Sequence, residues 1–134
     1  MSTSRSAGQS DDPLHMGAKN DDACVRQEDI GDVSVMIIEN ENLYPKQSQE
    51  IGRTIKLAIR DSKRPKILVD LTKVQFASSI FIGQLVDLHQ LAREKSGDLK
   101  VCVTGEHVAY TMKLVKLNKV IEIGGDKVKL LDSF

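Results

Sequence analysis

Short apolar runs alternate with amphipathic stretches of helix length from residue 23 to the end of the 134-residue chain. This order is typical of layered α/β proteins. The first two runs, Cys24 to Asp29 and Val33 to Ile38, are joined by Gly31 and Asp32. So short a connection predicts an antiparallel hairpin, and the later strand, helix, strand order predicts right-handed parallel crossovers. We therefore expect a mixed sheet of four to five strands, formed by an N-terminal hairpin and parallel strands, with three to four helices.

The other elements follow from the same periodicity. Pro45 suits a first helical turn, and the apolar spacing behind it predicts a helix over 45–62. Phe81, Leu85 and Leu88 recur at helical spacing and are expected to hold a second helix on the sheet. The remaining predicted elements are strands at 66–71, 99–104 and 120–123, a helix marked by Val108, Met112 and Val115, and a closing helix at 126–131.

Residues 1–22 differ from the rest of the chain in composition. They contain four serines and two Asp pairs, and their larger apolar residues are Leu14 and Met16. Such a segment buries too little apolar surface to offset the entropy lost on ordering. We therefore expect a disordered tail at 1–22 and a single domain at 23–134.

Composition narrows the class of protein. The 19 basic and 19 acidic residues cancel, so the chain has no overall field for nucleic acid. No run approaches the roughly 18 apolar residues of a membrane span, and no signal peptide is recognisable. Cys24 and Cys102 lie far apart and form no CxxC motif, and the apolar strand around Cys102 predicts core packing. We expect a reduced, cytoplasmic protein with no nucleic-acid partner.

Candidate catalytic groups are few. The chain has no P-loop, GxGxxG or HExxH motif, and His15, His89 and His107 have no partners at metal-ligand spacing. A Ser-His-Asp grouping would need Ser79, His89 and Asp70, but Ser79 lacks the GxSxG elbow. Asp70 is expected to cap the turn after its strand. We predict no enzymatic activity, no metal and no cofactor.

Lysines accompany the third predicted helix. Lys113, Lys116 and Lys119 could form a small basic face with Lys127 and Lys129. Charged residues at this spacing also commonly serve only to solvate a helix. The sequence leaves both interpretations open.

The segment from Ile67 to Leu85 is the most specific part of the chain, because it joins a buried strand to an amphipathic helix through two serines. It resembles the STAS domain, the fold of bacterial anti-sigma factor antagonists. The residues that keep their places in the family pattern are Asp70, Leu71, Val74, Phe76, Ser79, Ile82 and Gly83. The ending from Leu117 to Ile123 is also similar, and the order of elements agrees over residues 23–123.

The resemblance implies a regulatory protein that binds a kinase-type anti-sigma factor through the loop and N-terminus of the second helix. In the sigma-regulatory branch of the family, the kinase phosphorylates a serine there, and the unmodified antagonist sequesters the kinase so that the sigma factor is released. A phosphate adds about −1.5 to −2 charges to the docking surface. The alternative that the family offers is a small-ligand sensor for a nucleotide or lipid, which no feature of this sequence favours.

The sequence departs from the family pattern at the start of that helix. Ser78 replaces an Asp, Ser79 is retained, Ile80 stands at the usual phosphoacceptor position, and Phe81 replaces a Gly. Because Ile80 cannot accept a phosphate, either Ser79 or Ser78 is the acceptor, or the domain binds constitutively. Both serines also suit simple N-capping of the helix.

The loop after the predicted hairpin is also altered from the family's Gly-Glu-hydrophobic-Asp pattern, which points to a different choice of partner. The candidate partner-binding surface consists of Glu39, Asn40, Glu41, Asn42, Ser78, Ser79, Ile80 and Phe81.

Overall fold

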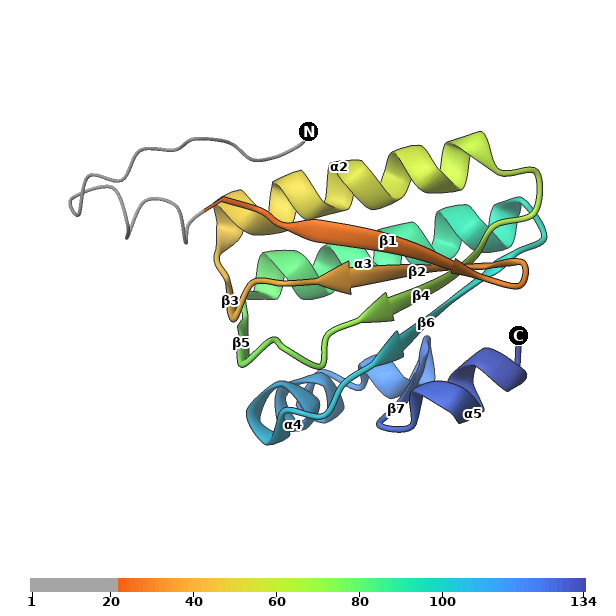
Figure 1. The fold of residues 1–134 in the computed structure, drawn as a ribbon. Helices are drawn as coiled ribbons and strands as arrows, with labels where there is room; N and C mark the ends of the chain where they lie inside the picture. Colours follow the sequence, from red (N-terminus) through yellow and green to blue (C-terminus); the bar gives the residue numbers. More distant parts are fainter. Residues whose placement is uncertain (1–21) are drawn as a thin grey trace.

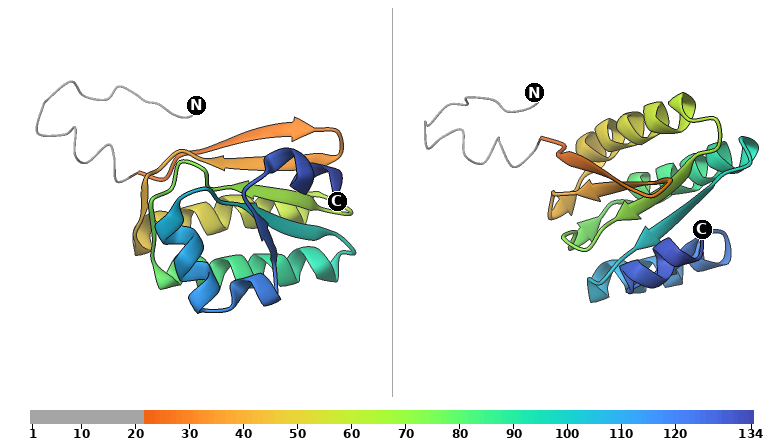
Figure 2. Two further views of the ribbon diagram at one scale, coloured as in Figure 1. Left: turned by 90° about the horizontal axis from the view of Figure 1, so that it is seen from below. Right: turned by 45° about the vertical axis from the view of Figure 1, so that its right-hand side comes forward.

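The computed structural model describes residues 22–134 (Figure 1). The tail predicted at 1–22 lies outside the described residues except for Asp22. The rest forms one α/β unit, whose main sheet lies between two helices on one face and a short helix on the other (Figure 2).

The main sheet has five strands in the order β1-β2-β4-β6-β7. The strands are β1 (Val25–Ile30), β2 (Val33–Ile38), β4 (Lys66–Asp70), β6 (Asp98–Cys102) and β7 (Glu122–Gly124). β1 and β2 pair antiparallel, and the other neighbours pair parallel. The hairpin turn contains Gly31 at a φ of +61°, which a residue without a Cβ adopts at little cost. The predicted mixed sheet with an N-terminal hairpin is confirmed.

Four helices surround this sheet within the described residues. They are α2 (Pro45–Asp61), α3 (Ser79–Glu94), α4 (Glu106–Leu114) and α5 (Lys127–Asp132), and a 3₁₀ turn, η2 (Leu117–Lys119), follows α4. Pro45 opens α2, where the missing N–H leaves no bond unmade. The predicted role of Val115 is wrong, because α4 ends at Leu114 and leaves Val115 55% exposed.

The core lies mainly between the sheet and the α2–α3 pair. Phe81 and Leu85 are fully buried there and Leu88 nearly so, which confirms the predicted inner face of α3. The Gln84 side chain of α3 occupies the space beside Gly52 of α2, where a Cβ would lie 1.3 Å from Oε1 of Gln84. Helix α3 has its N-terminus at the carboxyl end of β4 (Figure 1).

Candidate functional site

Two loops at the carboxyl end of β2 and β4 pair with each other. They form a second, two-stranded parallel sheet from β3 (Asn42–Leu43) and β5 (Phe76–Ala77). The carbonyl oxygen of Leu43 accepts a 2.9 Å hydrogen bond from the N–H of Ser78. The pairing fixes the starts of α2 and α3 side by side (Figure 1). Two-residue strands have no periodicity, so the sequence could not predict this sheet.

Ser78 is the N-cap of α3 and is half-buried. Its Oγ accepts a 3.4 Å bond from the N–H of Phe81 and lies 3.3 Å from Oγ of Ser48. The fully buried Ser48 donates to the carbonyl of Tyr44 at 2.8 Å, so the Ser78 hydroxyl is the donor to Ser48. Ser78 therefore joins the first turns of the two helices, and Ser48 is a site residue that no sequence motif marked.

Ser79 occupies the first position of α3 and is exposed. Its side chain bonds to no residue within 22–134. Ile80 follows it at 40% exposure, and Phe76 and Tyr44 are 38% and 50% exposed. The two aromatic rings contact each other, with centroids 5.5 Å apart. We call Tyr44, Phe76 and Ile80 the loop patch, an apolar surface next to the free hydroxyl of Ser79.

Two residues of the predicted partner surface lie inside the domain instead. Phe81 is 0% exposed because it faces the sheet from the first turn of α3. Asn40 is 8% exposed, and its amide joins the chain on either side: Oδ1 accepts from the N–H of Cys24 at 2.8 Å, and Nδ2 donates to the carbonyl of Asp22 at 2.6 Å. In this fold both side chains are structural. The loop patch residues Tyr44 and Phe76 were not expected there.

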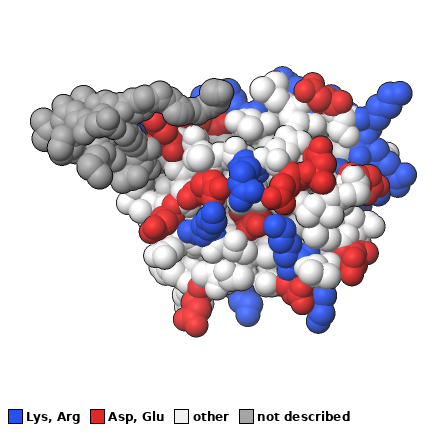
Figure 3. All heavy atoms as spheres, viewed as in Figure 1, with Lys and Arg blue, Asp and Glu red and all other residues white. Residues whose placement is uncertain are grey.

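Charged groups form the rim beside the loop patch. The Glu39 carboxylate pairs with the Lys73 ammonium and, at 3.1 Å, with the Arg26 guanidinium. The hydrogen bonds from Lys73 and then Arg26 hold the pKa of Glu39 below its usual value. Glu41 and Asn42 are exposed beside this network. Positive and negative side chains alternate over the face that carries β1, so no single sign dominates it (Figure 3).

Asp70 is buried where β4 ends, and its carboxylate is fully bonded. Oδ1 accepts from the N–H and hydroxyl of Thr72 at 2.9 and 2.7 Å, and Oδ2 lies 3.1 Å from Nζ of Lys127. Burial alone would raise the pKa of Asp70, but the bonds from Thr72 and Lys127 outweigh it and leave the pKa lowered. The turn-capping role predicted for Asp70 is confirmed.

The structure does not assemble the Ser-His-Asp grouping considered from the sequence. His89 lies ten residues after Ser79 on α3, which separates them by about 15 Å along the helix. His89 instead places Nε2 3.4 Å from Oδ1 of Asp98. Among residues 22–134, no three His, Cys, Asp or Glu side chains are grouped to hold a metal ion.

A shallow groove of about 310 Å³ runs between the outer sides of α2 and α3. Its lining combines charged and polar side chains, among them Arg53, Lys56 and Asp87, with the apolar Leu88 and Leu91. No helix in the described part of the chain is long and apolar enough to cross a membrane.

Comparison with known proteins agrees with this architecture. A family profile described as STAS domain matches residues 26–129. An anti-sigma factor antagonist from Mycobacterium paratuberculosis has a similar structure, with a TM-score of 0.75 and 19% identity over 84% of this chain and 94% of that chain. An anti-sigma-factor antagonist (STAS) domain protein from Planctomyces limnophilus is also similar, with a TM-score of 0.70 and 21% identity. The match covers 81% of this chain and 96% of that chain. A search of curated protein sequences found no match.

Proposed function

The chain belongs to the STAS domain family, and we propose that it is a non-catalytic regulatory module that binds a kinase-type anti-sigma factor in a partner-switching pathway. The observation that carries the proposal is the loop patch, which places three exposed apolar side chains next to Ser79, whose hydroxyl makes no bond within residues 22–134. The structural similarity to proteins described as anti-sigma factor antagonists supports the class of partner. Such a module would act in the bacterial cytoplasm.

The loop patch has the properties of a protein-binding surface. Grouped exposed apolar side chains mark interaction sites, and aromatic residues such as Tyr44 and Phe76 are enriched in interfaces. The β3–β5 pairing and the Ser48–Ser78 contact hold both loops in place before binding. A rigid surface loses little conformational entropy when a partner docks.

Ser79 is the better of the two candidate phosphoacceptors. Its exposed hydroxyl at the first position of α3 makes no bond that a phosphate would break. Free N–H groups and the helix dipole favour a phosphate at this end of a helix. A phosphate on Ser78 would instead disrupt the cap of α3 and the contact with Ser48. Modification of Ser79 would add charge beside an apolar surface, so it would weaken docking while leaving the fold intact.

The test uses the full-length protein and the purified kinase-type anti-sigma factors of the same organism. Incubation with ATP and phosphopeptide mapping should place the phosphate on Ser79. In calorimetry, Ser79→Ala should bind but resist phosphorylation, and Ser79→Asp should bind at least about tenfold more weakly. Ser96→Asp is the matched control, because it adds the same charge at an exposed position beyond the other end of α3.

The possible failures differ from one another. Tight binding without phosphate on either serine would show constitutive binding and would remove the switch. If none of these kinases bound the wild-type protein, the proposed partner would be wrong. Retention of a nucleotide or lipid by the purified protein would then favour the sensor alternative.

A further inference from the structure

Helix α4 has an apolar surface on the side turned away from the core. Val108 and Met112 face inward and are 1% exposed. Tyr110 and Leu114, two positions further along, lie about 200° around the helix from them. Tyr110 and Leu114 are 62% and 63% exposed, so packing within the domain does not account for them.

The turn after α4 extends this surface. Lys116 adopts a left-handed backbone with φ of 59° and bonds to the carbonyl of Lys113 at 3.0 Å, which ends the helix and leads into η2. The turn leaves Val115 and Val120 outside, at 55% and 52% exposure. We call Tyr110, Leu114, Val115 and Val120 the α4 ridge.

The α4 ridge is unusual among the exposed apolar residues of the protein. Within the described chain, ten large hydrophobic side chains are exposed, and seven of them belong to the loop patch or the α4 ridge. The others, Ile30, Leu57 and Val128, are single residues on β1, α2 and α5 and need no explanation. The exposure of the loop patch and of the α4 ridge is therefore best explained by binding to another molecule.

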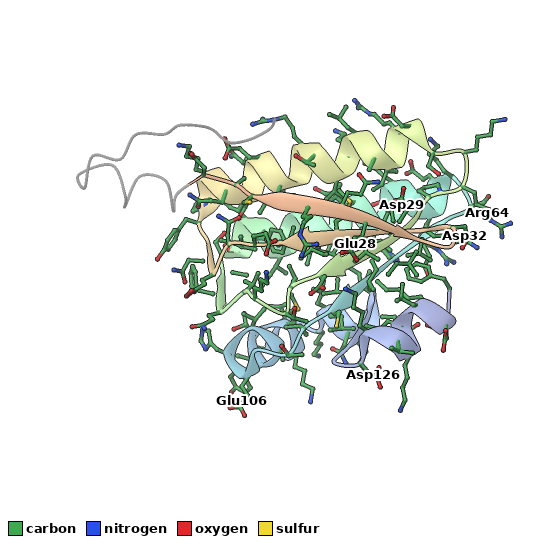
Figure 4. All side chains as sticks on the ribbon, viewed as in Figure 1. Glu28, Asp29, Asp32, Arg64, Glu106 and Asp126 are labelled. Carbon is green, nitrogen blue, oxygen red and sulfur yellow. The ribbon has the colours of Figure 1, made fainter. Side chains whose placement is uncertain are left out.

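Lysines predominate among the charged residues of segment 106–122, which carries the α4 ridge, with three lysines against two glutamates. Lys113, Lys116 and Lys119 are exposed, and none pairs with a carboxylate within 22–134. Glu106 stands in the first turn of α4 (Figure 4), and the next acidic residue along the chain is Glu122. Other lysines of the domain do pair with acids, namely Lys66, Lys73, Lys100 and Lys127.

This concentration of charge differs from the rest of the molecule. The whole chain has a formal net charge of zero, whereas the three lysines beside the α4 ridge have no carboxylate partner within residues 22–134. The surface is complementary to a partner that presents apolar side chains among Asp and Glu residues.

Helix α4 begins at the same end of the sheet as the loop patch. Helix α4 contacts β5, which carries Phe76 (Figure 1). Gly105, the N-cap of α4, approaches the loop before β5 so closely that a Cβ would lie 2.9 Å from the carbonyl oxygen of Val74. A protein seated on the loop patch would therefore lie close to the start of α4.

We propose that the α4 ridge is a second contact surface for the same partner, and that it docks an acidic, partly apolar face of the kinase-type protein. The inference rests on the proposed function and adds the chemistry of the partner. A second copy of this chain fits poorly, because it would bring lysines against lysines. A membrane also fits poorly, because polybasic lipid-binding segments carry about four to eight basic residues.

The test measures the affinity of the full-length protein for a kinase-type anti-sigma factor that binds the wild type, at low and high KCl. Lys113→Glu/Lys116→Glu/Lys119→Glu should bind about tenfold more weakly and should lose most of the salt dependence of the association rate. Leu114→Ser should also weaken binding. The control Arg60→Glu/Lys63→Glu/Lys129→Glu makes the same change in net charge at exposed positions outside α4, and it should bind like the wild type.

Hydrogen exchange of the wild-type complex separates this inference from the proposed function. Protection at both the start of α3 and residues 106–121 supports the α4 ridge. Protection at α3 alone, with unchanged affinity of the triple lysine variant, overturns the α4 ridge and leaves the proposed function standing. Failure of the wild type to bind, with no protection at either place, overturns both.

Two further results would assign the α4 ridge to another occupant and overturn the inference. One is a wild-type dimer in light scattering that Leu114→Ser dissociates. The other is sedimentation with vesicles of 30% phosphatidylglycerol and 70% phosphatidylcholine that the triple lysine variant abolishes.

Discussion

The two faces of the main sheet are stabilised in different ways. Within residues 22–134, the core on the α2–α3 side contains 22 buried apolar residues, and the core on the α5 side contains six. The α2–α3 side is therefore the principal source of hydrophobic stability. It also anchors α3, which carries Ser79, through Phe81 and Leu85.

The α5 side contains the buried polar groups of the sheet. Lys100 is 3% exposed, and its ammonium donates to the carbonyl and hydroxyl of Ser133 at 2.7 and 2.6 Å. It also lies 3.3 Å from the Glu122 carboxylate and 4.6 Å from the ring centroid of Phe134. A buried ammonium is tolerated only when it is bonded in this way. The stability of the smaller core thus depends on specific polar partners, whereas that of the larger core depends on the amount of apolar side chain that it buries.

Cys102 lies on the α5 side at 1% exposure, as the prediction of core packing requires. Burial, and then the nearby Asp70 carboxylate, raise the pKa of its thiol. The group therefore stays protonated and packs as a small apolar side chain.

The largest effect should come from the larger core. Leu85→Ala removes a fully buried side chain between α3 and the sheet, and it should cost about 2–5 kcal/mol of the free energy of unfolding. Urea titration measures this loss, and Leu57→Ala, at a 57% exposed position of α2, should change little. A midpoint equal to that of the wild type would show that this core is not the main source of stability.

Leu130→Ala tests the smaller core with the same change of side chain. Leu130 is 4% exposed but belongs to a six-residue helix that can shift to fill the space, so the expected cost is about 2 kcal/mol. Hydrogen exchange should increase in α5 and not in α3. Equal loss of protection in both helices would contradict the contrast between the two faces.

Acid should weaken the α5 side of the sheet through the Asp70 carboxylate. The pKa of Asp70 is lowered in the folded protein, so its ionised form contributes stability above the unfolded value of about 3.9. That contribution is lost as the pH falls through the folded pKa. Asp70→Asn should cost about 1.5 kcal/mol at pH 7, and the difference from the wild type should shrink at low pH. Urea midpoints between pH 7 and pH 2.5 provide the measurement, and a constant difference would refute the role of the carboxylate.

The smallest effect concerns the surface pair next to the loop patch. Lys73→Ala should cost less than about 1 kcal/mol, because Lys73 is 53% exposed and solvent screens its attraction to Glu39. Thermal unfolding at low and high salt should show a difference that salt reduces further. A loss as large as that of Leu130→Ala would mean that the rim supports the fold.

Local periodicity was enough to predict the regular elements. The hairpin around Gly31, the helix opened by Pro45 and the inner face of α3 all agree with the structure. Each depends on residues that are neighbours in sequence, where backbone preference and apolar spacing act directly. The family motif also marked Ser79, which lies exposed at the start of α3.

Contacts between distant residues decided the rest. Lys127 bonds to Asp70, 57 residues away, so its charge is neutralised by a partner that the local pattern did not mark. The hydroxyls of Ser48 and Ser78, 30 residues apart, are within hydrogen-bond distance, and the Asn40 amide bonds to the backbone of Asp22 and Cys24. The sequence by itself determined which longer segments are strands and helices, because that depends on local pattern, but not the two-residue strands β3 and β5. Only the tertiary structure decided which side chains of those segments meet or stay exposed, because that depends on how the layers pack.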